Sequence, residues 1–79
     1  MIKVGLVEDN ETLREGLETL IELADDMECV CASETVKEAL KMIPRAKPDV
    51  VLMDIQLPDG TGIECTAKIK ELLPAVQIV

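Results

Sequence analysis

Three carboxylates stand where two apolar segments of the sequence end. Glu8 and Asp9 follow residues 2–7, and Asp54 closes the run VVLMD at residues 50–54. If these segments are neighbouring parallel strands, their ends meet at the edge of the sheet where ligands bind in such folds. Like charges held so close repel, so at least one carboxyl pKa should rise unless a cation joins them. Carboxylate oxygens suit a hard divalent cation, and the pattern predicts a Mg²⁺ site.

Other uses of these acids account for less of the pattern. Asp9 could help to cap a helix and Asp54 could cap a turn, but capping explains single acids rather than three at two strand ends. A nucleotide-cofactor site needs glycines after the first strand, whereas residues 8–11 read EDNE and would repel phosphate. A phosphatase of the haloacid dehalogenase type wants a second acid two residues after the nucleophile. That position is Gln56, although Asp54 could still be a nucleophile.

The segments around these acids alternate between strand and helix patterns. Short apolar runs predict strands at 2–7, 27–32, 49–55 and 75–79. Helical spacing predicts three helices between them, with apolar positions Leu13, Leu17, Leu20, Ile21 and Ala24, then Val36, Ala39, Leu40 and Ile43, then Ile63, Ile69, Leu72 and Leu73. The order β-α-β-α-β-α-β predicts an α/β fold, a doubly wound parallel sheet with helices on both faces.

Capping residues mark the expected helix starts. Asn10 is a candidate N-cap, and the T-x-x-E form of a capping box occurs at residues 35–38 and 61–64. The expected exits follow from prolines, with Pro44 and Pro48 bracketing the end of the second helix and Pro74 closing the third.

Composition limits the partners and the compartment. The 79 residues are enough for one small domain, and their net charge of −8 argues against binding nucleic acid or an anionic membrane. No apolar run is long enough to span a bilayer, and the N-terminus lacks a signal-peptide pattern. Cys29 and Cys31, predicted on one face of a strand, and Cys65 are interpreted as core thiols of a cytoplasmic protein.

The chain closely resembles the receiver domain of two-component response regulators over all 79 residues. The resemblance rests on the acidic pair Glu8-Asp9, on Asp54 within LMDIQLP, on Pro58 four residues later and on Gly62 eight residues later. It implies the flavodoxin-like receiver fold.

The resemblance also implies roles for the matching positions. Asp54 would be the phosphoacceptor, attacking the phosphohistidine of a sensor histidine kinase. Asp9 would bind Mg²⁺ directly, Glu8 directly or through water, and the backbone carbonyl of Gln56 would supply another ligand. Such a domain is not an enzyme, apart from slow hydrolysis of its own acyl phosphate.

The run LREGLETLIE at residues 13–22 is similar to the branch whose receivers are fused to LuxR-type helix-turn-helix effectors. It implies transcriptional control through a C-terminal DNA-binding domain. Receivers continue past the position of Val79, to a Thr or Ser and a Lys that contact the phosphoryl group. We therefore expect a receiver truncated after the fourth strand.

An alternative is a non-signalling module that self-associates. In either case we expect a homodimer in which edge strands pair or elements are exchanged around the fourth strand, residues 75–79, because exposed edges and apolar patches recruit other chains. Intact mass and light scattering separate the alternatives.

Overall fold

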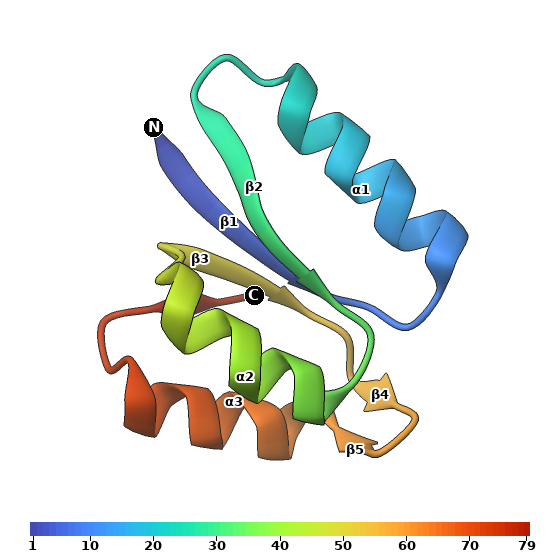
Figure 1. The fold of residues 1–79 in the computed structure, drawn as a ribbon, viewed down its shortest axis with the longest axis vertical. Coiled ribbons are helices and arrows are strands. Elements are labelled where there is room, and N and C mark those ends of the chain that lie inside the picture. Colours follow the sequence, from blue (N-terminus) through green and yellow to red (C-terminus); the bar gives the residue numbers. More distant parts are fainter.

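A four-stranded parallel sheet forms the centre of the structure, a computed structural model that describes all 79 residues. Its strands lie in the order β2-β1-β3-β6 (Figure 1). Their bounds are β1 Ile2–Val7, β2 Met27–Ser33, β3 Val50–Met53 and β6 Gln77–Ile78, and all three pairings are parallel. The predicted doubly wound α/β fold is confirmed.

The helices cover the two faces of the sheet unequally. α1 (Glu11–Leu23) lies on one face, and α2 (Val36–Ala46) and α3 (Gly62–Leu72) lie on the other (Figure 1). The α2/α3 face holds a cluster of 10 buried residues, whereas the α1 face holds only three, Val4, Leu6 and Ile21. The sheet is therefore well covered on one side and thinly covered on the other. None of the helices has the length and apolar character needed to cross a membrane.

All three helices start at the predicted capping residues. The side-chain oxygens of Asn10, Thr35 and Thr61 accept hydrogen bonds from the backbone N–H groups of Leu13, Glu38 and Glu64 at 2.9, 3.0 and 3.1 Å, respectively. Each bond satisfies one of the N–H groups that the first turn of a helix leaves without a partner.

The second helix ends where it was predicted to end, between Pro44 and Pro48. α2 passes through Pro44 to Ala46 and ends at Lys47, whose φ of 50° is left-handed. A proline in the last turn removes only one hydrogen bond of the helix, so the helix tolerates it there.

The apolar stripe predicted for the third helix is wrong in part. Ile63 and Leu72 are 75% and 55% exposed, whereas Cys65 and Ile69 are fully buried. Because α3 begins directly at Gly62, the face turned to the sheet contains positions 62, 65 and 69. The predicted stripe began at Ile63, one residue after Gly62, where the buried face of α3 begins.

The strands also depart from the predicted ranges. Residues 49–55 narrow to β3, residues 75–79 narrow to β6, and a small antiparallel hairpin was not predicted. This hairpin joins β4 (Gln56–Leu57) to β5 (Gly60–Thr61) and connects β3 to α3 (Figure 1).

A bulge in β2 separates two of the cysteines. Val4 pairs with Cys29 and Gly5 with Cys31, which makes Val30 an extra residue. Cys29 packs with the cluster under α1, whereas Cys31 is buried in the cluster under α2 and α3. The prediction that both lie on one face is wrong, because the bulge shifts the alternation of side chains. All three cysteines are free thiols.

Candidate functional site

The ends of β1 and β3 bring the three predicted carboxylates together. The two strands are paired up to Val7 and Met53, and Asp54, the residue after β3, donates its N–H to the carbonyl of Val7 at 2.9 Å. Ligand oxygens of Glu8, Asp9 and Asp54 all lie within 4.8 Å of one another. The predicted convergence at this edge of the sheet is confirmed.

The cluster is electrostatically unfavourable without a cation. Burial raises the pKa of the Glu8 carboxyl above its ordinary value, and the neighbouring Asp54 and Asp9 raise it further. The N–H of Asn10, which donates to Glu8 Oε2 at 3.1 Å, opposes this rise. The predicted rise of one carboxyl pKa therefore falls on Glu8, with burial as its largest cause.

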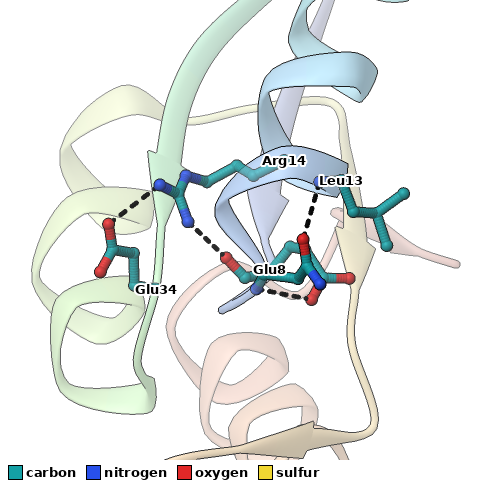
Figure 2. Close-up of polar contacts among 5 residues, drawn as sticks. Glu8, Leu13, Arg14 and Glu34 are labelled. Atoms are coloured by element: carbon teal, nitrogen blue, oxygen red, sulfur yellow. Dashed lines mark hydrogen bonds and ion pairs between the residues drawn. The ribbon is translucent and has the colours of Figure 1, made fainter.

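Arg14 fixes the backbone beneath the acidic pair rather than neutralising it. Its Nη1 donates to the backbone carbonyl of Glu8 at 3.0 Å, and its Nη2 pairs with Glu34 Oε1 at 3.0 Å (Figure 2). The Arg14 side chain is only 12% exposed, so the guanidinium is held in place. Its two short contacts go to the Glu8 carbonyl and to Glu34, which leaves the carboxylate cluster with its excess of negative charge.

Glycine at position 62 lets α3 begin against the backbone of Asp54. A Cβ on Gly62 would lie 2.0 Å from the Asp54 carbonyl oxygen and 3.0 Å from Met53 Cγ. No side chain fits there, because real Cβ atoms do not approach backbone this closely. The Gly62 N–H also donates to the carbonyl of Ile55 at 2.7 Å. Asp54 is thus held from both sides, by β1 and by the start of α3.

Gln56 lies on the hairpin directly after Asp54. Hydrogen-bonded and non-hydrogen-bonded residue pairs alternate along an antiparallel ladder. Because the Gly62 N–H donates to the Ile55 carbonyl, Gln56 and Thr61 form a non-hydrogen-bonded pair. The Gln56 carbonyl therefore points away from the ladder and is free for another partner. This orientation suits the predicted role, although its place in a cation site stays a prediction.

The capping alternative fails for Asp9. The N-cap of α1 is Asn10, and no backbone N–H donates to the carboxylates of Asp9 or Asp54. The oxygens of both residues are therefore free to bind a ligand.

The donor set fits a hard divalent cation. It consists of three carboxylates, of which Asp9 is exposed and Glu8 and Asp54 are partly buried. A hollow lined by Met53, Asp54, Ile55, Gly62, Ile63 and Thr66 adjoins the cluster on the side of α3. An oxygen-only set beside an open hollow suits Mg²⁺, which keeps several water ligands.

Two residues of this region were missed in the sequence. The sequence pattern assigned no role to Arg14, and Asp59 appeared there only within a Pro-Asp-Gly turn. Asp59 instead accepts hydrogen bonds from the N–H groups of Val36 and Lys37 at 2.8 and 3.0 Å. Its partners are more than 20 residues away, so local patterns carry no signal for this contact.

Comparison with known proteins identifies relatives of the chain. Residues 4–79 match the family model of the response regulator receiver domain. The chain is 34% identical over 79 residues to the transcriptional regulatory protein LnrK of Bacillus subtilis, and 39% identical over 74 residues to the DNA-binding transcriptional activator DevR/DosR of Mycobacterium tuberculosis. These alignments cover 100% and 94% of this chain, but only 36% and 34% of the relatives. The chain spans about a third of their length.

Solved structures agree with this assignment. The response regulator domain of Thermotoga maritima CheB matches with a TM-score of 0.93 and 32% identity, over 99% of this chain and 57% of that one. A LuxR-family response regulator from Aurantimonas matches with a TM-score of 0.89 and 34% identity, over 96% and 54% of the two chains.

Proposed function

Because the chain belongs to the response regulator receiver domain family, we propose that it accepts a phosphoryl group from the phosphohistidine of a sensor histidine kinase onto Asp54. The observation that carries the proposal is the approach of the Glu8, Asp9 and Asp54 oxygens to within 4.8 Å of one another, beside an open hollow. Phosphoryl transfer depends mainly on positioning and charge neutralisation, and this cluster offers a place for both.

The carboxylates of Glu8, Asp9 and Asp54, with the backbone carbonyl of Gln56, would hold the cation. When bound, Mg²⁺ supplies positive charge that offsets the negative charge of the transferred group. The raised pKa of Glu8 supports this proposal, because a cation removes the repulsion from Asp54 and Asp9 that contributes to the rise.

Asp54 is the nucleophile in this proposal. One carboxylate oxygen attacks the phosphorus, a P–O bond forms, and the P–N bond to the donor imidazole breaks. The imidazole nitrogen keeps the electron pair and takes up a proton. The bond from Asp54 N–H to the Val7 carbonyl and the close approach of Gly62 hold the nucleophile at the strand end.

The protein would act as a stoichiometric acceptor rather than as an enzyme, because the phosphoryl group ends on its own side chain and leaves only by slow hydrolysis. The relatives named as transcriptional regulators support a role in transcription, with DNA bound outside this acidic segment of net charge −8. We place the protein in the cytoplasm, since free thiols are typical of a reducing compartment.

The test is to incubate the protein, in the form that its host produces, with a small acyl phosphate and then to measure its intact mass by mass spectrometry. We expect the mass of one phosphoryl group in Mg²⁺ and none in excess chelator. Asp54→Asn should stay unlabelled, and the control Asp49→Asn, an exposed acid at the opposite end of β3, should label normally. Equal labelling with and without Mg²⁺ would contradict the proposal.

A further inference from the structure

Asp59 ties the hairpin after Asp54 to the start of α2. Its Oδ1 accepts from the Val36 N–H at 2.8 Å and its Oδ2 from the Lys37 N–H at 3.0 Å. Both carboxylate oxygens are thus used on one helix terminus, where the helix dipole also favours a negative charge. These two donors lower the pKa of Asp59 below its ordinary value, as expected of a carboxylate that stays ionised in place.

The hairpin depends on this tie for its position. β4 and β5 contain two residues each, and a ladder this short has little stability of its own. Leu57 is buried in the core under α2 and α3, while the neighbouring Gln56 and Pro58 are exposed. Asp59 and Leu57 therefore anchor the segment that carries the Gln56 carbonyl.

The loop that carries Glu8 is also held by residues 34–37, the junction between β2 and α2. Arg14 holds the Glu8 carbonyl with one guanidinium nitrogen and Glu34 with another (Figure 2). Glu34 lies just before Val36 and Lys37. Residues 34–37 therefore contact Arg14, which holds Glu8, through one ion pair, and Asp59 of the hairpin through two hydrogen bonds. The junction is a common support for two loops that are distant in sequence.

We propose that Asp59 is a positioning residue of the cation site, which holds the hairpin on the first turn of α2 and thereby couples cation binding to the order of residues 34–37. The proposal rests on the proposed function, because it requires that a cation binds at Glu8, Asp9 and Asp54. A cation that fixes both the loop at Glu8 and the hairpin at Gln56 reduces the conformational freedom of residues 34–37. By linkage, ordering of residues 34–37 raises the affinity for the cation.

The first test is amide hydrogen exchange of the wild-type protein, followed by NMR with and without Mg²⁺. Hydrogen exchange at the Val36 and Lys37 amides should slow by about threefold or more in Mg²⁺. Opening of residues 34–37 would then disturb the bound cation and so cost more free energy. The control is the amide of Lys3, whose N–H donates to Oδ2 of an exposed aspartate, Asp49, at 2.8 Å. This bond lies at the far end of the sheet from the carboxylate cluster. Equal slowing at all three amides would overturn the coupling.

The second test is Mg²⁺ titration calorimetry of Asp59 variants. Asp59→Ala should weaken Mg²⁺ binding by about tenfold, the lower end of what loss of an outer partner costs a metal site. Asp59→Asn keeps an acceptor oxygen and should restore part of the affinity, which a general loss of stability would not do. Asp49→Ala removes a comparable carboxylate-to-backbone bond and should bind as wild type.

The outcomes separate the two proposals. If the wild-type protein binds no Mg²⁺, the proposed function fails and this inference fails with it. If the wild type binds Mg²⁺ and both Asp59 variants bind equally well, the inference alone is overturned. If Asp59→Ala does not fold, Asp59→Asn and the exchange experiment decide the same question.

Discussion

At the scale of single residues, Glu8 makes a prediction about pH. Its folded-state pKa is raised from the ordinary 4.5, so over the window just above that value the native state holds a proton that the unfolded state has lost. Stability from this group is therefore lost as pH rises through the window and stays lower above it. Glu8→Gln removes this contribution, so the variant should gain stability relative to wild type from pH 4.5 upward.

Urea unfolding in excess chelator across that pH range measures the difference between the two proteins. Adding Mg²⁺ at neutral pH should stabilise the wild type, since a ligand that binds only the folded state shifts the equilibrium by mass action. The interpretation of Glu8 fails if wild type gains stability relative to Glu8→Gln as pH rises in chelator.

Asp9 makes a prediction about the cation itself. It is the exposed member of the cluster, and replacing it removes one direct ligand while leaving the strand ends intact. Asp9→Ala should weaken Mg²⁺ binding by at least about tenfold, which corresponds to about 1.4 kcal/mol. Asp26→Ala, which removes an equal charge in the turn between α1 and β2, is the calorimetric control. Unchanged affinity in Asp9→Ala would remove the metal site from the account.

At the scale of elements, two glycines make opposite predictions for the same substitution. Gly62→Ala places a Cβ 2.0 Å from the Asp54 carbonyl oxygen, so α3 must shift and the protein should lose several-fold more stability than a typical surface change. Gly16 lies inside α1, and apart from its chain neighbours and the backbone of its own helix no atom lies within 4 Å of its Cβ position. Gly16→Ala should therefore stabilise the protein by about 1 kcal/mol. Thermal unfolding of both variants checks this pair, and a stable Gly62→Ala would contradict the close approach.

The elements also show what the sequence could predict. The order of strands and helices, the three caps and the convergence of the acids follow from local periodicity and from the geometry of parallel sheets. The bulge at Val30 depends on the pairing of β2 with β1, which is distant in sequence. The hairpin at 56–61 is local, but its strands of two residues are too short to show a periodic pattern. The phase of α3 follows from its start at Gly62, which the apolar spacing does not reveal. The ties made by Arg14 and Asp59 also depend on distant segments, because their partners lie on other elements.

At the scale of the 79-residue chain, the unequal covering of the sheet predicts association. Only 17 of 79 residues are buried, and the exposed side chains of α1 include Leu13, Leu20 and Leu23 at 50%, 65% and 75%. β2 and β6 form the two open edges of the sheet. Exposed apolar surface and unpaired edges favour pairing with a second copy.

We therefore expect the 79-residue chain to form a dimer, with edge strands paired or exchanged around β6, and this expectation keeps the self-associating alternative open. Light scattering should give twice the monomer mass at micromolar concentration, and the unfolding midpoint should rise with protein concentration. A monomer whose cooperative unfolding does not depend on concentration would contradict it.

The measurement that tests the account most directly is the position of the phosphoryl group. After incubation with a small acyl phosphate and Mg²⁺, the protein as its host makes it would be digested and its labelled peptide sequenced by mass spectrometry. We expect the phosphoryl group on Asp54, at the end of β3, and no labelled peptide from Asp54→Asn. A phosphoryl group on Glu8 or Asp9, or one that persists in Asp54→Asn, would show that the nucleophile has been wrongly assigned.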